Sequence, residues 1–299
     1  MEKAKGGIAM KEIENRTFSE ERALYHAKDL RLKNCRFAGE EDGESALKET
    51  ENIELISCFL DLRYPLWHGK NLRIVDSRMT SSCRAALWYS SRISIEDCRM
   101  NGIKALRECE EIEMKGTSVV SPEFGWKSRN IVGNDLSIES EYLFFEARNL
   151  RLNGLKFKGK YSFQYVKDVE IADSELDTKD AFWHAKNVVI RNSTVKGEYL
   201  AWYSENVTFI DCTIIGTQPL CYCKKLTLIR CRCVSCDLAF EYSDVDADLI
   251  GSIDSIKNPR SGTIAVDEAK ELIYTSDSVY PPLGKVIQRK ETLSSEERR

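Results

Sequence analysis

A short motif recurs along most of this 299-residue chain and constrains what the chain can fold into. Each copy has a polar residue, called the marker below, then apolar residues one and three positions later. Asn, Asp or Gly follows at position five, Cys or Ser at position six, and an apolar residue at position eight. The markers are Asp29, Asn52, Asn71, Arg92, Glu111, Asn130, Asn149, Asp168, Asn187, Asn206, Lys225 and Asp244. The steps between them are 23, 19 and 21 residues, and then 19 eight times. Such periods are typical of solenoids, in which each turn buries its apolar side by stacking on its neighbours.

The columns of the repeat predict the local structure of each turn. The residue after every marker is apolar, and apolar residues return two positions later, which is the period of a strand. Asn, Asp and Gly at position five tolerate a bend or a left-handed backbone, so we expect the chain to turn there. Positions six and eight indicate a second strand whose Cys, Ser and apolar side chains point inward.

A third strand is expected from seven to three residues before each marker, for example over residues 65–68 and 181–184. Three short strands per turn predict an all-β fold, a single-stranded parallel β-helix of about 12–13 turns with about 19 residues per turn. The Asn and Asp markers fit a ladder in which each side chain bonds to the backbone of the next turn. A left-handed hexapeptide helix needs turns of about 18 residues and a leucine-rich repeat needs a helix, so neither matches.

The repeat also divides the chain. We expect an N-terminal cap over residues 1–28, with Ile8, Ile13 and Phe18 in an incomplete first turn, the β-helix over 29–273, and a C-terminal segment over 274–299. Residues 263–266 fit a thirteenth turn, and the charged residues 290–299 are expected to fray. Two insertions, within 38–45 and 80–84, precede the third strand.

Composition excludes several classes of protein. With 44 Lys and Arg against 48 Asp and Glu, the net charge of −4 is unlike that of a nucleic-acid or membrane-surface binder. No apolar run approaches the roughly 20 residues of a membrane span, and the first residues lack the apolar stretch of a signal peptide. We therefore expect a cytoplasmic protein. Its 11 cysteines are then best interpreted as reduced core residues.

Several segments resemble a bacterial family, the domain of unknown function 3737. They are residues 21–25 (Glu-Arg-Ala-Leu-Tyr), 43–49 (Gly-Glu-Ser-Ala-Leu-Lys-Glu), 64–67 (Tyr-Pro-Leu-Trp), 121–126 (Ser-Pro-Glu-Phe-Gly-Trp) and 216–221 (Gly-Thr-Gln-Pro-Leu-Cys). The resemblance extends from about residue 16 to about residue 267. It implies a right-handed parallel β-helix of the pectin-lyase-like kind and no established activity, so no catalytic residue is carried over.

Three columns of the expected third strand bear on function. The tryptophan column, four residues before the marker, holds all five tryptophans, and the leucine column beside it is mostly Leu and Phe. The column three before the marker is polar or ionisable and should face water, which sends the tryptophans inward and the leucine column outward. Lys48, Arg107 and Gln164 in the tryptophan column argue against that orientation. Either orientation leaves an apolar stripe that a ligand, a partner or the chain's own tail should cover.

Two functions for this stripe remain open. Aromatic faces flanked by Glu, His and Tyr would suit an oligosaccharide. The candidate ligand-binding residues are Leu66, Trp67, Trp88, Trp126, Phe182, Trp183, His184, Trp202 and Tyr203. The alternative is a non-enzymatic scaffold whose face is closed by self-association, a protein partner or the apolar C-terminal segment.

Catalysis is the less favoured hypothesis. Glu108 and Glu146 share a column two turns apart, roughly 9–10 Å, as in an inverting glycosidase, although an alternating charge ladder explains them more simply. Glu49 and His68 lie on adjacent turns as a candidate acid–base pair, or as a surface ion pair. The turns before the third strand are short and predict a shallow surface, which weighs against a glycoside hydrolase or lyase.

No cofactor or metal is expected. The cysteines at 221, 223, 231, 233 and 236 have a zinc-like spacing, but the repeat places Cys231 and Cys233 at inward positions, which favours core packing. The three histidines share one column, yet His184 lies six turns from His68, so they cannot form one site.

Overall fold

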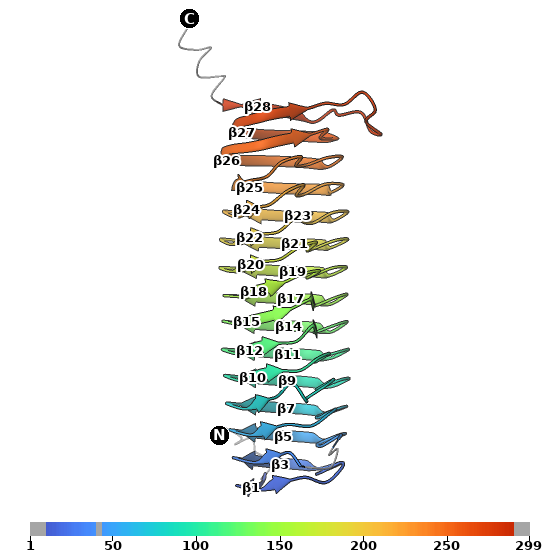
Figure 1. Cartoon of the computed structure of the whole chain (residues 1–299), viewed down its shortest axis with the longest axis vertical. Coiled ribbons are helices and arrows are strands. Elements are labelled where there is room, and N and C mark those ends of the chain that lie inside the picture. Colours follow the sequence, from blue (N-terminus) through green and yellow to red (C-terminus); the bar gives the residue numbers. More distant parts are fainter. Residues whose placement is uncertain (1–9, 40–43, 290–299) are drawn as a thin grey trace, which may run out of the picture. The chain divides into compact units, whose positions relative to one another are not determined.

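The computed structural model describes residues 10–39 and 44–289. The protein is an all-β parallel β-solenoid of about 14 turns with about 19 residues per turn, which confirms the fold predicted from the repeat. It forms two compact units, Met1–Val132 and Gly133–Arg299, and within each unit the turns stack one above another (Figure 1). Ile8, residues 40–43 of the first insertion and residues 290–299 lie outside the described residues.

Each turn contributes one strand to a first sheet and a shorter one to a second sheet. In the first unit the first sheet contains β1 (Lys11–Glu14), β3 (Lys28–Lys33), β5 (Glu51–Ile56), β7 (Lys70–Val75), β9 (Ser91–Glu96) and β11 (Glu110–Lys115). The second sheet contains β2 (Thr17–Phe18), β4 (Arg36–Phe37), β6 (Phe59–Leu60), β8 (Arg78–Met79), β10 (Arg99–Asn101) and β12 (Ser118–Val120). β13 (Glu123–Phe124) lies on the third side of a turn, and the boundary between the units falls within β14 (Arg129–Asn134).

The second unit repeats this arrangement. Its first sheet contains β17 (Arg148–Asn153), β19 (Lys167–Ala172), β21 (Lys186–Arg191), β23 (Glu205–Ile210), β25 (Lys224–Val234), β26 (Asp244–Lys257), β27 (Ser261–Ile273) and β28 (Lys285–Gln288). Its second sheet contains β15 (Ser137–Ser140), β18 (Lys156–Gly159), β20 (Glu175–Asp177), β22 (Thr194–Lys196), β24 (Thr213–Ile215) and the end of β25. β16 (Tyr142–Leu143) lies on the third side.

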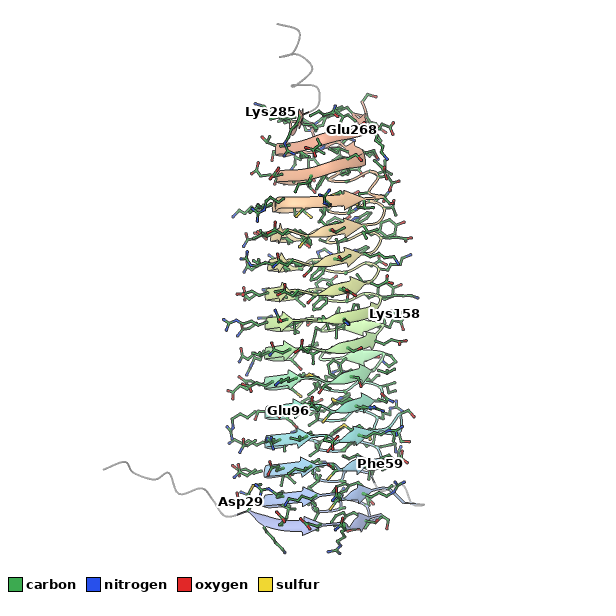
Figure 2. All side chains as sticks on the ribbon, turned by 90° about the vertical axis from the view of Figure 1, so that its left-hand side faces the viewer. Asp29, Phe59, Glu96, Lys158, Glu268 and Lys285 are labelled. Atoms are coloured by element: carbon green, nitrogen blue, oxygen red, sulfur yellow. The ribbon has the colours of Figure 1, made fainter. Side chains whose placement is uncertain are left out.

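The apolar columns form the core of each unit because the parallel register brings equivalent residues together. Val188 pairs with Val207 and Ile190 with Phe209, and all four side chains are buried. The side chains between them project outward, and within each unit they form rows across successive turns (Figure 2). This alternation confirms the strand predicted after each marker.

The bend predicted at position five is also confirmed. Asp173 and Asn192 have φ angles of 50° and 48°, in the left-handed region that Asn and Asp tolerate. Such a corner leaves an inward backbone N–H without a partner in the sheet. The small polar residue at position six accepts a hydrogen bond from this N–H. Ser193 Oγ, for example, accepts the N–H of Ser174 at 3.1 Å and donates to Arg191 O at 2.6 Å.

Cysteine fills the same role at other corners, which explains its abundance. Cys98 Sγ accepts the N–H of Ser77 at 3.4 Å, and Cys212 Sγ contacts Ile190 O at 3.4 Å. All eleven cysteines are buried and free of disulfides, which confirms their interpretation as reduced core residues.

The marker ladder differs from the prediction. Asn187 Nδ2 donates to Asp168 Oδ1 at 2.8 Å, and Asn206 Nδ2 donates to Asn187 Oδ1 at 2.9 Å. The bonds therefore join side chain to side chain on the exposed surface rather than side chain to backbone. The reason is that the marker itself is left-handed, with φ of 56° at Asn187, so its side chain points outward.

The prediction of a strand on the third side is wrong for most turns. Left-handed residues alternate there with residues outside the left-handed region, as at Phe182 (φ 59°) and His184 (φ 54°). The Phe182 N–H bonds to Ser162 O of the preceding turn at 2.9 Å, and the His184 N–H bonds to Trp202 O of the following turn at 3.0 Å. A backbone that alternates in this way lets two consecutive side chains point inward, which a strand forbids.

The last turns of the second unit have longer strands. β27 pairs with β26, with Ser261 beside Asp244, so the turn predicted at residues 263–266 is present but follows after 17 residues rather than 19. β28 adds a further strand beside β27. Among the described residues we find no helix with the length and apolar character needed to cross a membrane.

Candidate functional site

The backbone of the third side determines which side chains are accessible to a ligand. It orients the leucine column inward, opposite to the prediction. Leu66 and Phe182, predicted to face outward, have exposed fractions of 0 %. The residue before each is buried as well, because the left-handed backbone turns both inward. The leucine column is therefore part of the core, and neither residue can contact a ligand.

The tryptophans are half-buried and have a structural role. Trp183 Nε1 donates to Tyr199 O and Trp202 Nε1 to Gln218 O, each at 2.7 Å. Trp67 and Trp88 make the same bonds to Ala85 O and Lys104 O. In each case the acceptor is a left-handed residue of the next turn. The indole thus satisfies a carbonyl that the irregular backbone leaves unpaired.

The same geometry explains the polar residues in the tryptophan column. Gln164 Nε2 donates to Asp180 O at 2.9 Å and replaces the indole donor. The Arg107 guanidinium lies over the rings of Trp88 and Trp126, at 5.1 and 5.6 Å from their centroids, so a cation continues the stack of rings. Lys48 Nζ lies 5.9 Å from the Trp67 centroid. In the sequence, these polar residues argue against an interior position for the tryptophan column. Their side chains do lie at the protein surface, beside the stacked rings.

One residue further along each turn, the second unit carries a row of rings that we call the aromatic ladder. It consists of Tyr165, His184, Tyr203, Tyr222 and Tyr242. The first four stack in parallel, with centroids 4.9, 5.2 and 4.7 Å apart and interplanar angles of 11–16°. Tyr242 follows at 5.6 Å and is tilted by 56°. The exposed fractions of Tyr165 and Tyr203 are 47 % and 46 %.

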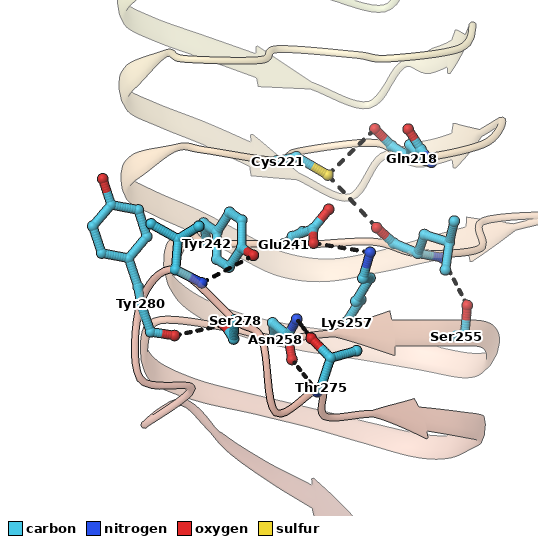
Figure 3. Close-up of polar contacts among 12 residues, drawn as sticks. Gln218, Cys221, Glu241, Tyr242, Ser255, Lys257, Asn258, Thr275, Ser278 and Tyr280 are labelled. Atoms are coloured by element: carbon cyan, nitrogen blue, oxygen red, sulfur yellow. Dashed lines mark hydrogen bonds and ion pairs between the residues drawn. The ribbon is translucent and has the colours of Figure 1, made fainter.

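The ladder differs at one end from the sequence prediction, which placed Glu241 in this column and Phe240 in the tryptophan column. Phe240 is buried, Glu241 pairs with Lys257 at 3.0 Å, and Tyr242 continues the ladder. The register moves by one residue because Asp244 lacks the left-handed conformation that the preceding marker, Lys225, adopts. Figure 3 shows this end of the ladder, where Tyr280 of the C-terminal segment packs against Tyr242 at 5.4 Å.

Burial raises the pKa of several groups on this side, among them Tyr222 and Asp180. Burial, helped by the negative charge of Glu241, raises the pKa of Tyr222 to about 12, so its hydroxyl stays protonated at neutral pH. Burial also raises the pKa of Asp180, which lies seven residues before its marker and is only 9 % exposed. The Tyr222 hydroxyl of the ladder can therefore still donate a hydrogen bond at neutral pH.

The candidate catalytic residues are dispersed. Glu49 Oε2 accepts a hydrogen bond from Tyr25 Oη at 3.1 Å and lies 3.4 Å from His26 Nε2, whereas His68 stacks on Tyr89 at 5.0 Å. The structure thus shows Glu49 engaged with His26 rather than with His68.

The second candidate pair is divided between the units. Glu108 belongs to the first unit, is exposed and lies 3.7 Å from Arg107 Nε. Glu146 belongs to the second unit and is also exposed. Neither unit holds both carboxylates, so neither contains the predicted pair by itself.

Other side chains give no further site. Across residues 10–39 and 44–289, no three His, Cys, Asp or Glu side chains are grouped so that they could hold a metal ion. Sequence reasoning did place His184 and Tyr203 among the candidate ligand-binding residues, and both lie in the ladder. It missed Tyr165 and Tyr222 because their column was treated as a polar flank, although its recurring rings were visible in the sequence. It missed Tyr242 because the repeat placed Glu241 in that column.

Comparison with known proteins gives a family and distant structural neighbours. Two mutant forms of the periplasmic alginate epimerase AlgG are similar at 8 % and 9 % identity. Each match covers 87 % of this chain, with 76 % and 77 % of the epimerase and TM-scores of 0.26 and 0.27. No curated protein shows significant sequence similarity to this chain. The family model for DUF3737, a protein of unknown function, matches residues 11–285, and the chain therefore belongs to the DUF3737 family.

Proposed function

We propose that the third side of the second unit is a non-catalytic surface that recognises a carbohydrate chain. The observation that carries this proposal is the aromatic ladder, in which Tyr165, His184 and Tyr203 are exposed and Tyr222 and Tyr242 are half-buried. Such a row repeats one kind of contact at every turn, and a linear oligosaccharide repeats its own groups in the same manner.

The stacking decides how the ligand would be held. Parallel rings about 5 Å apart are offset stacks, in which each ring covers part of its neighbour. A sugar therefore meets ring edges, phenol hydroxyls and imidazole nitrogens, and these groups donate and accept hydrogen bonds to its hydroxyls. The tryptophans have a structural role rather than a binding role, because the indole N–H groups of Trp183 and Trp202 are already bonded to backbone carbonyls.

The residue types of the ladder favour recognition of a carbohydrate over its hydrolysis. Glycoside hydrolysis needs two carboxyl groups on opposite sides of one bond. The five ladder residues include no carboxylate, and Glu241 beside the ladder is paired with Lys257.

Titration with a panel of neutral and acidic oligosaccharides, followed by tryptophan fluorescence and calorimetry, tests this proposal. We expect Tyr203→Ala to weaken binding by about threefold to tenfold, the value of one hydrogen bond. Tyr274→Ala is the matched control, because Tyr274 is 50 % exposed but lies outside the ladder. Absence of binding by every oligosaccharide, or an equal loss in Tyr274→Ala, would contradict the proposal.

A second candidate function is self-association through the C-terminal segment. Val279 and Leu283 have exposed fractions of 75 % and 73 %, and the segment is anchored where the Val279 N–H donates to Tyr242 Oη at 3.3 Å (Figure 3). Light scattering should then report a dimer that Leu283→Ser dissociates. A wild-type monomer at high protein concentration would exclude this candidate.

A further inference from the structure

Charged side chains on adjacent turns of this protein usually alternate in sign. In the second unit Lys186 pairs with Glu205 at 3.0 Å and Lys179 with Glu198 at 2.9 Å. The column immediately before the marker behaves in the same way in the first unit, where Lys28 pairs with Glu51 at 3.1 Å and Arg129 with Glu110 at 2.6 Å. Opposite charges on neighbouring strands stabilise a sheet, whereas like charges destabilise it.

Three cations on successive turns of the second unit break this rule. Arg148 pairs in register with Lys167, and Lys167 with Lys186, at the starts of β17, β19 and β21. Lys186 has Glu205 on its other side. Within the described residues, neither Arg148 nor Lys167 has a carboxylate oxygen within the 4.0 Å of an ion pair. We call these three residues the basic row.

The basic row runs beside the aromatic ladder. Lys167 follows Tyr165 by two residues, and Lys186 follows His184 by two residues. The residues between them, Val166 and Ala185, are fully buried, whereas Tyr165, His184 and Lys186 are exposed and Lys167 is half-buried. A ligand lying on the ladder therefore passes the unpaired cations.

The carboxylates nearest along the chain are already engaged. Asp168, the next residue after Lys167, accepts a hydrogen bond from Asn187 at 2.8 Å. Glu205 is bonded to Lys186, and Glu146, two residues before Arg148, has a partner of its own. A bound anion would thus supply the charge that the neighbouring turns do not.

We propose that the ligand of the ladder is an acidic oligosaccharide, whose carboxylate or sulfate groups bind Arg148 and Lys167 while its hydroxyls contact Tyr165, His184 and Tyr203. This inference rests on the proposed function, because it assumes that the ladder binds a sugar chain. Its chemistry is that of charge-assisted hydrogen bonds from guanidinium and ammonium groups to an anion.

The test uses ligands matched in length. Calorimetry of the full chain compares a cello-oligosaccharide with its C6-carboxylated and C6-sulfated counterparts, and a single-stranded oligonucleotide serves as a polyanion without sugar hydroxyls in the same arrangement. We expect one or both acidic forms to bind more tightly than the neutral form, and their advantage to shrink with added salt. The relative affinities of the two acidic forms identify which anionic group is preferred.

Variants assign the effect to the basic row. Lys167→Gln should weaken binding of the preferred acidic form by about fivefold and leave the neutral form unchanged. Arg148→Gln should do the same. Lys158→Gln is the matched control, because Lys158 is exposed in the same unit but projects from the second sheet (Figure 2). Unchanged thermal unfolding of these surface variants shows that they remain folded.

Failure of this inference can be distinguished from failure of the proposed function. Equal, ladder-dependent binding of neutral and acidic forms would overturn this inference and leave the proposed function standing. An equal effect of Lys158→Gln, or tighter binding of the oligonucleotide, would also overturn it. Binding of none of the oligosaccharides would remove the proposed function and this inference together.

Discussion

The carboxylate of Glu54, in β5, is held between guanidinium groups from the two neighbouring turns. Arg31 Nε donates to it at 2.5 Å from one side and Arg73 donates from the other, and the residue is only 8 % exposed. Burial by itself would raise the pKa of Glu54, but the hydrogen bonds from Arg31 and Arg73 outweigh it and hold the pKa below its usual value. A charge at this position is tolerated only because both partners are supplied by adjacent turns.

This arrangement predicts a pH-dependent stability. Because the pKa is lower in the folded protein, the carboxylate stabilises the fold above about pH 4.3, the ordinary value for Glu, and that contribution is lost as the pH falls through the folded-state pKa. Glu54→Gln should lower the free energy of unfolding by about 2–3 kcal/mol at pH 7, and by less as the pH approaches 3.5.

Urea unfolding of both proteins across this pH range measures the difference. Glu113→Gln is the control, since Glu113 is exposed at the equivalent position of β11. A loss that stays constant with pH would show that the charge of Glu54 is not what stabilises the fold.

At the scale of the element, the third side shows how backbone conformation overrides residue pattern. Phe163 stacks on Phe182 with centroids 4.8 Å apart and an angle of 6°, and its exposed fraction is 0 %. Tyr165, two residues later, is exposed in the aromatic ladder. In a strand these two residues would point to the same side. Here they do not, because Phe163 and Tyr165 themselves have left-handed backbone conformations.

The two positions should therefore respond differently to truncation. Phe163→Ala should lower the free energy of unfolding by about 3–5 kcal/mol through the cavity that it leaves. Tyr165→Ala should cost about 1 kcal/mol or less, as is usual for a surface residue. Chemical denaturation followed by circular dichroism measures both. Similar losses in the two variants would contradict the orientation of this segment.

Every thiol of the chain is buried. All eleven cysteines are buried, and burial raises the pKa of Cys109 and of Cys223 to about 12. Only the thiolate reacts readily, so the raised pKa disfavours attack at Cys109 and Cys223, and burial disfavours it at all eleven cysteines.

Dithionitrobenzoate should consequently label fewer than one thiol per native chain at neutral pH, and all 11 after denaturation in guanidinium chloride. Absorbance of the released thionitrobenzoate gives the count. Fast labelling of one or more thiols in the native protein would contradict the burial of this set.

The amino-acid sequence alone was sufficient for the solenoid, its period, its two regular strands and the corner at position five. These features depend on residue type at fixed spacing, and stacking repeats the same local choice at every turn. The orientation of the third side was not predictable, because Leu66 and Phe182 show nothing in their identity that specifies a positive φ. That conformation is fixed by hydrogen bonds to the turns before and after. The leucine column is core, the tryptophans donate to backbone carbonyls, and tyrosine and histidine form the aromatic ladder only because the folded chain fixes this backbone conformation.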